Sequence, residues 1–256
     1  MEMAKSSNSM NHSFSDFTVK QYRELLKKTK NLAYRAIGYN EHSISEKWVI
    51  WRHDIDFSPQ RALAIARIEH EEDIKSTYFI LPHSRFYNLF EKECTDLIFE
   101  IQNLGHTIGL HFDCAYFNIN RLDQEKIEDK VQLEKVFLEE VFETQIDCFS
   151  FHSPQKWAVD WGVNEVSGCI NAYSEFFMNE VGYASDSNGI WRNESILSRI
   201  EEGLPKLQLL THPVWWTDEV SSPKDRFLRA VNGRSDALIT QHQKHWGKIG
   251  RPLIDW

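Results

Sequence analysis

The sequence lacks the features of membrane-spanning, secreted and disulfide-rich proteins. It contains no run of roughly 18 apolar residues, so no transmembrane helix is predicted. Its first residues do not combine a basic segment with an apolar one, and therefore do not resemble a secretory signal peptide. The four cysteines are scattered without a CxxC pair, so we expect reduced, buried thiols. These absences predict a cytoplasmic protein without a membrane span.

Basic residues are outnumbered as well. The chain has 29 Lys and Arg against 38 Asp and Glu, a formal net charge of -9, and no local Lys/Arg cluster offsets it. Such a balance opposes phosphate backbones, so we expect no nucleic-acid partner. The 256 residues, 41% of them hydrophobic, are enough for one large core. We expect a flexible, Ser/Asn-rich N-terminus over residues 1–13 and a single domain over residues 14–256.

After residue 13, short apolar runs alternate with longer amphipathic ones. This alternation is typical of parallel strands joined by crossover helices, and it predicts an α/β fold. Strands are expected at residues 48–54, 76–81, 106–112, 148–152 and 206–212. Helices are expected at residues 18–31, 59–71, 89–104, 123–142 and 221–246, the last of them bent or interrupted near Gly233. Residues after 153 show no clean period, so long loops are expected there.

Acidic and imidazole side chains stand at the ends of four of these strand-like runs. They are Asp54 with Asp56, His111, His152 and His212. Because the carboxyl ends of parallel strands share one edge of a sheet, we expect these side chains to converge in one pocket. Asp54 and Asp56 are two residues apart and would face the same side of an extended strand, whereas His53 would point the other way.

The residue types at this edge point to a metal ion. Two neighbouring carboxylates repel each other in a buried pocket unless a cation or a proton separates them. A mixed Asp/His set suits zinc or another first-row divalent ion better than calcium or magnesium. Each residue also has a structural interpretation, since Asp-x-Asp pairs commonly cap loops and strand histidines such as His152 are as often core residues as ligands. Agreement among four strand ends favours the metal.

Five motifs follow one another along the chain and extend this pattern. They are WRHDIDFSP, GHTIGLHFD, FSFHSP, YASDSNGIW and LLTHP. In this order they resemble the successive motifs of the polysaccharide deacetylases, also called carbohydrate esterase family 4. Together they span residues 48–216, which is most of the chain. The resemblance implies a distorted (β/α) barrel of about seven parallel strands. It also implies a metal-dependent hydrolase that removes an acyl group, in the usual case acetyl, from the amide nitrogen of an N-acetylated sugar.

The resemblance implies a role for each matching residue. Asp54 resembles the catalytic base and Asp56 the metal-binding aspartate, in a spaced variant of the commoner adjacent Asp-Asp pair. His111 resembles the first metal histidine, and His212 resembles the general acid. Asp186 resembles the aspartate that supports the catalytic pair.

The chain departs from the family pattern at two places. Ala115 stands where the pattern has a second metal histidine, and the Arg that usually accompanies the FHSP motif is absent. His152 or Asp113 would complete the metal site, and we favour His152 because an imidazole preserves the ligand type. The residues expected to bind substrate are Arg52, His53, Trp191, Arg192 and Trp215.

The expected cofactor is a divalent transition metal, zinc by preference, and the expected partner is a small-molecule or glycan substrate carrying an N-acyl group. For a cytoplasmic protein, a nucleotide-linked or lipid-linked sugar intermediate fits better than a cell-wall polymer. Two alternatives stay open: a C–N hydrolase acting on a small non-sugar amide, and a non-catalytic carbohydrate-binding barrel, which Ala115 suggests. Asp54 and His212 argue against the second alternative, because neither is needed merely to bind a sugar.

Overall fold

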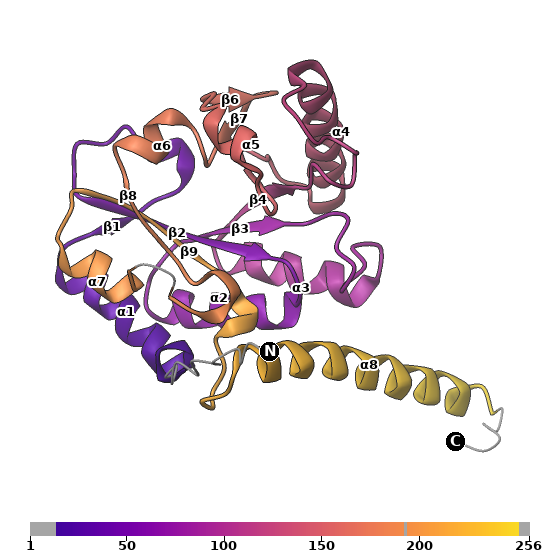
Figure 1. The fold of residues 1–256 in the computed structure, drawn as a ribbon. Helices are drawn as coiled ribbons and strands as arrows, with labels where there is room; N and C mark the ends of the chain where they lie inside the picture. The colour runs from indigo at the N-terminus through magenta and orange to yellow at the C-terminus, as the bar shows by residue number, and fades with distance from the viewer. Residues whose placement is uncertain (1–13, 192–193, 251–256) are drawn as a thin grey trace, which may run out of the picture.

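The fold is built on one curled, mostly parallel sheet. The structure, a computed structural model, describes residues 14–191 and 194–250 (Figure 1). Within them the sheet has nine strands, in the order β6-β7-β5-β4-β3-β2-β9-β8, with β1 also pairing to β2. The strands are β1 (Arg35–Ala36), β2 (Trp48–Ile55), β3 (Thr77–Ile80), β4 (Thr107–Phe112), β5 (Cys148–Phe151), β6 (Glu165–Val166), β7 (Cys169–Asn171), β8 (Gly182–Ser185) and β9 (Lys206–Thr211). All pairs are parallel except β6 with β7, which confirms the predicted α/β fold class.

Most of the helices connect successive strands of this sheet, whereas the first helix precedes β1 and the last follows β9. The helices are α1 (Val19–Asn31), α2 (Pro59–Glu71), α3 (Lys92–Asn103), α4 (Gln124–Phe142), α5 (Lys156–Asp160), α6 (Glu175–Asn179), α7 (Ile196–Glu201) and α8 (Pro223–Lys248). Four short 3₁₀ turns are η1 (Ser15–Phe17), η2 (Tyr39–Glu41), η3 (Ser187–Gly189) and η4 (Pro213–Trp215). In Figure 1, α8 extends outward past the sheet. None of the helices in the described ranges has the length and apolar character needed to cross a bilayer.

Three of the predicted helix starts are confirmed by their capping contacts, whereas the helix expected from residue 89 begins at Lys92. Thr18, Ser58 and Asp123 each accept a hydrogen bond from the backbone N–H three residues later, at 3.2 Å. These bonds satisfy amide groups that have no partner within the helix, and Pro59 stands at the start of α2. Local side-chain chemistry therefore sets where the helices that connect the strands begin.

Two expectations about the second half of the chain were wrong. Strands β6, β7 and β8 lie in a region expected to be loop, because strands of two to four residues are too short to show a period. Helix α8 runs without interruption through Gly233. One exposed glycine costs a helix only about 1 kcal/mol, which the flanking turns of α8 offset. The expected flexible segment, residues 1–13, lies outside the described residues.

Alternate residues of β2 face opposite sides of the sheet. Trp48 and Ile50 belong to one hydrophobic cluster, whereas Val49 and Trp51 belong to a second cluster that includes α1 and β9. All eight residues of β2 are buried. The strand that leads to the two aspartates is thus packed on both faces, which fixes its position.

A buried carboxylate anchors the second of these faces. Glu69, on α2, accepts hydrogen bonds from Tyr22 (2.6 Å), Ser76 (2.6 Å), Tyr78 (2.5 Å) and the Nε2 of His53 (2.8 Å). Burial would raise the pKa of Glu69, but the charge and hydrogen bond of His53 lower it to about 2. The ionised carboxylate therefore links helices α1 and α2 to strands β2 and β3.

We expect Glu69→Gln to lower the free energy of unfolding by about 3 kcal/mol at pH 7, because an amide NH₂ would face hydroxyl donors in the core. The folded-state pKa lies below the usual 4.5, so the contribution of Glu69 is present above pH 4.5 and is lost as the pH falls toward 2. Urea denaturation measures the loss. The exposed neighbour Glu71→Gln serves as control and should change stability by less than about 0.5 kcal/mol. Equal stability of Glu69→Gln and the wild type would contradict this account.

Candidate metal centre and active site

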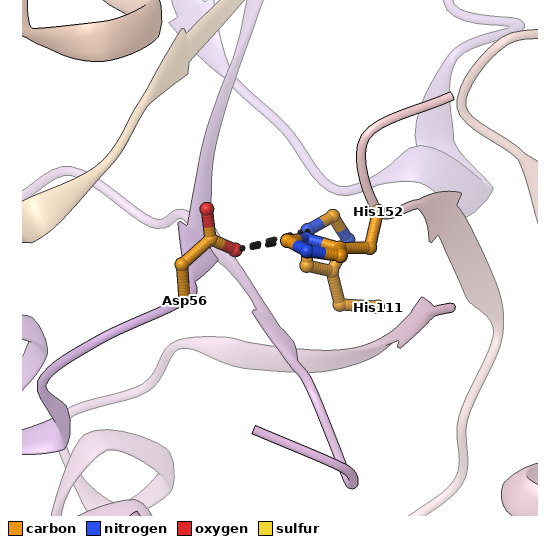
Figure 2. Close-up of side chains that lie close together, drawn as sticks. All are labelled: Asp56, His111 and His152. Atoms are coloured by element: carbon orange, nitrogen blue, oxygen red, sulfur yellow. Dashed lines mark hydrogen bonds and ion pairs between the residues drawn. The ribbon is translucent and has the colours of Figure 1, made fainter. Parts of the chain in front are cut away.

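Three electron-pair donors meet at the carboxyl edge of the sheet (Figure 2). Asp56 directly follows β2, His111 is the second-to-last residue of β4, and His152 directly follows β5. These strands are parallel, and β3 joins β2 to β4 while β4 pairs with β5. Their ends therefore share one edge, as the sequence predicts. Among the described residues, no other group of three or more His, Cys, Asp or Glu side chains is close enough to share a metal ion.

The three ligand atoms lie close to one another. The Nε2 of His111 is 3.2 Å from Oδ1 of Asp56, and the Nδ1 of His152 is 3.4 Å from the same oxygen. The two histidine nitrogens are 3.2 Å apart. Ligands about 2.0–2.1 Å from a tetrahedral zinc ion would be separated by roughly 3.3 Å. The donor set and its spacing thus fit such an ion, and the buried Oδ1 of Asp56 has no hydrogen bond of good geometry.

Asp54 lies beside this centre and is held by a buried arginine. The Nη2 of Arg52 donates to Oδ1 and Oδ2 of Asp54 at 3.1 and 2.8 Å, and also to Oγ of Ser150 at 2.5 Å. Burial would raise the pKa of Asp54, but the Arg52 charge holds it below its usual value. The Oδ2 of Asp54 lies 3.6 Å from Nε2 of His111. An ionised carboxylate, able to accept a proton, therefore borders the three donors.

His212 also lies beside this centre. It follows β9, which pairs with β2, and its Nε2 lies 3.8 Å from Oδ2 of Asp56. Its Nδ1 is 2.7 Å from Oδ1 of Asp186, whose Oδ2 accepts from Nε1 of Trp216 at 2.8 Å. Burial would lower the pKa of His212, but the charge of Asp186 raises it to about 9. At neutral pH the ring is therefore protonated, with Nε2 as the available donor.

A cavity of about 960 Å³ opens over these groups. Five sequence-predicted residues that bear acids or imidazoles line it, together with the predicted Trp215: Asp54, Asp56, His111, His152 and His212. Asp186 is fully buried and contacts the cavity only through His212. Asp113, the alternative third ligand, also lines the cavity, but its Oδ1 accepts from the backbone N–H of Ala115 at 2.8 Å. The structure brings His152, and not Asp113, to the other two donors.

Three residues expected to bind substrate lie away from the cavity. Arg52 is fully buried beneath Asp54, and His53 is fully buried on the opposite face of β2 with Glu69. The period of the strand sends His53 to that face, so assigning it to substrate contact was wrong. Trp191 stacks on Phe17 and donates to Asp16. Arg192 lies outside the described residues.

Sequence reasoning missed several residues that line the cavity. Among them are His83, which follows β3, the exposed Arg85, and Tyr173. The strand-end rule applied to the run that includes β3 would have found His83. The Nε2 of His83 is 2.6 Å from Oε1 of Glu134, a residue of α4 that is 3% exposed. No local pattern marks Glu134, because it occupies the buried stripe of an otherwise ordinary amphipathic helix.

Comparisons with known proteins found only distant structural likenesses. No protein-family model and no curated protein matches the sequence. Solved structures do match. The chain is similar in structure to members of carbohydrate esterase family 4. A family 4 carbohydrate esterase from Bacillus anthracis matches with 14% identity and a TM-score of 0.44, covering 88% of this chain and 90% of the other.

Two further structures show a similar, distant likeness. A deacetylase from Streptococcus pyogenes, solved with acetate, has 14% identity and a TM-score of 0.42 over 82% of this chain and 85% of its own. A pseudoenzyme of the same family from Bacillus anthracis has 15% identity and a TM-score of 0.41 over 75% of this chain. This chain spans 62% of the length of that pseudoenzyme.

We expect the chain to bind one zinc ion, with the affinity lowered at least about 100-fold in Asp56→Asn, His111→Ala and His152→Ala, because removing a ligand costs more than removing its outer partner. Competition with a chromophoric chelator measures the affinity. The control Asp113→Asn should keep the wild-type affinity. Loss of zinc from Asp113→Asn, with zinc retained by His152→Ala, would show that the third ligand has been misassigned.

We expect Glu134→Gln to stabilise the protein at pH 8 by on the order of 2 kcal/mol and to have little effect at pH 5. Burial, followed by the charge of Asp113, raises the pKa of Glu134 from 4.5 to about 8. The unfolded carboxyl ionises above pH 4.5 while the folded one stays protonated, so the folded state loses stability as the pH rises toward 8. Urea denaturation at both pH values tests this, with exposed Glu128→Gln on the same helix as control. A difference that is equal at pH 5 and pH 8 would refute it.

Proposed function

We propose that this chain is a metal-dependent hydrolase that removes an acetyl group from the amide nitrogen of an N-acetylated sugar or glycan intermediate. The observation that carries the proposal is the convergence of three ligands, Asp56, His111 and His152, between a carboxylate and a protonated imidazole. Amide hydrolysis requires these parts together, since a water must lose a proton and the departing nitrogen must gain one.

The donor set suits zinc, which Asp56, His111 and His152 would hold through one oxygen and two nitrogens. When bound, such an ion polarises an acyl carbonyl and lowers the pKa of a nearby water. The backbone carbonyl of Ser150 lies 3.3 Å from Nδ1 of His111. That contact favours a proton on Nδ1 and leaves Nε2 free to coordinate.

Asp54 is the proposed proton acceptor. Arg52 keeps its carboxylate ionised and limits its rotation by contacting both oxygens. Because both charges are buried, the pair must be arranged this way in the folded state, and the base is held in place before substrate arrives.

His212 is the proposed proton donor to the departing nitrogen. An amide nitrogen is a poor leaving group until it is protonated, so a donor is needed on the side of the substrate away from the base. Asp186 accepts a hydrogen bond from the backbone N–H of His212 and also contacts Nδ1 of its ring. The other ring nitrogen, Nε2, therefore points toward Asp56. The role of Asp186 is to orient the ring and to stabilise its charge.

The assignment to a sugar substrate rests on the motif resemblance. Trp215 and Tyr173 supply aromatic surface to the cavity, on which sugar rings stack, but aromatic walls also accept other small amides. A cytoplasmic location, expected from the sequence, would favour a sugar intermediate over a wall polymer. A binding-only barrel is the alternative that Ala115 suggests, although His152 supplies an imidazole to the same centre.

Acetate release from N-acetylated sugars, compared with small non-sugar amides, tests the proposal on the zinc-loaded protein. We expect Asp54→Asn and His212→Gln each to lower kcat by about 10²–10⁴-fold, since each removes one proton-transfer step. The exposed Asp160→Asn should retain full activity. Zinc binding without acetate release from any N-acetylated sugar would exclude the sugar deacetylase, and release from small amides alone would favour the other C–N hydrolase.

A further inference from the structure

A second, smaller cavity lies next to the first. It has a volume of about 260 Å³ and lies between the start of α2, the turn η4 and the first half of α8. Four arginines line it: Arg61, Arg226, Arg229 and Arg234. No acidic side chain of the described residues lines it. In a chain whose formal net charge is -9, such a concentration of positive charge needs an explanation.

Arg226 is a buried guanidinium with an unused donor. It is 1% exposed, and its Nε and Nη2 donate to Oγ1 of Thr217 (3.3 Å) and the carbonyl of Phe14 (3.0 Å). Its Nη1 has no hydrogen-bond partner. No carboxylate of the described chain forms an ion pair with it, and burial lowers its pKa to about 10. Burying a cation this way is costly unless an anion comes to it.

Two of the three neighbouring arginines, Arg61 and Arg229, also lack an ion pair within the described residues. The Nη2 of Arg61 donates to the carbonyl of Trp216, while its Nε is buried without a partner. Burial lowers the pKa of Arg61, and the nearby Arg229 lowers it further, against a raising effect of Asp218. Arg229 is exposed and forms no ion pair within the described ranges. Of the four arginines, only Arg234 forms an ion pair with a carboxylate in the described part of the chain, and that partner is Glu91.

We propose that this cavity binds a phosphoryl group. Guanidinium N–H groups form charge-assisted hydrogen bonds to phosphate oxygens, and three guanidiniums without an ion pair around one space fit a phosphate, with its several oxygens, better than a single carboxylate. One water takes up about 30 Å³ of liquid, so a cavity of this volume has room for a phosphoryl group with part of the molecule that carries it. The phosphate would supply acceptors for the orphan donors of Arg61 and Arg226.

The position of the cavity connects it to the proposed reaction. Phe57 and Phe86 line both cavities, and their ring centroids are 4.7 Å apart. Phe57 directly follows the ligand Asp56. A phosphoryl group in this arginine-lined cavity would therefore be separated from the cavity of the candidate metal centre by the rings of Phe57 and Phe86. The further step, that the bound phosphoryl group belongs to a phosphorylated N-acyl sugar, rests on the proposed function. Phosphate binding by the cavity does not.

Binding of pyrophosphate to the metal-free protein, measured by calorimetry at constant ionic strength, tests the site without acyl chemistry. We expect saturable binding, weakened at least about 10-fold in Arg229→Gln, which removes a charge-assisted contact but no hydrogen bond of the fold. Lys244→Gln removes the same charge from an exposed position of α8 outside the cavity and should bind as the wild type does. Absence of saturable binding to the wild type, or equal affinity of both variants, would overturn the proposal.

A kinetic comparison then identifies the source of the phosphate. With the zinc-loaded protein, N-acetylglucosamine 1-phosphate should have a lower KM than N-acetylglucosamine, and Arg229→Gln should raise KM for the phosphorylated sugar alone. Pyrophosphate binding combined with equal KM values would support the site and assign it to a separate phosphorylated molecule. The calorimetry uses neither metal nor an acyl substrate. Its result would therefore be the same if the protein had no deacetylase activity, and the two proposals can fail separately.

Discussion

The close approach of the ligand atoms of Asp56, His111 and His152 is the constraint on which the rest of the site depends. Their ligand atoms lie between 3.2 and 3.4 Å apart, a spacing that electron-pair donors keep only around a cation or a shared proton. Strands β2, β4 and β5 hold them there because their backbones are fixed in one parallel sheet. Asp54, on β2, and His212, directly after β9, both lie beside this centre.

Strand β2 meets this constraint by having ordered polar groups on both of its faces. Toward the cavity, Arg52 neutralises Asp54; on the far face, His53 donates to Glu69. Each buried charge has a partner of opposite sign or a full set of hydrogen-bond donors, so neither face favours movement of the strand. Buried residues that do not line the cavity, Arg52 and Glu69 among them, thus hold the strand that carries Asp54 and leads to Asp56.

Much of this arrangement could be predicted from the sequence because it depends on strand ends. The period of β2 places Asp54 and Asp56 together and sends His53 away, and the parallel order brings His111, His152 and His212 to the same edge. Long-range packing was not visible. Trp191 looked available for substrate, yet Phe17, far away in the sequence, covers it. Likewise the short strands β6 to β8 are held by their neighbours, and their own residues show too little periodicity to mark them.

The arginine cavity was hidden for the same reason, since Arg61 and the three arginines of α8 meet only in the folded chain. Its construction has a consequence for how the protein could diversify. The candidate metal ligands, Asp54 and His212 all belong to the sheet and the segments directly after its strands, whereas α8 supplies most of the cationic lining of the second cavity. Substitutions in α8 would therefore change the charge of this cavity without altering the ligand atoms of the candidate metal centre, so the two sites can vary independently.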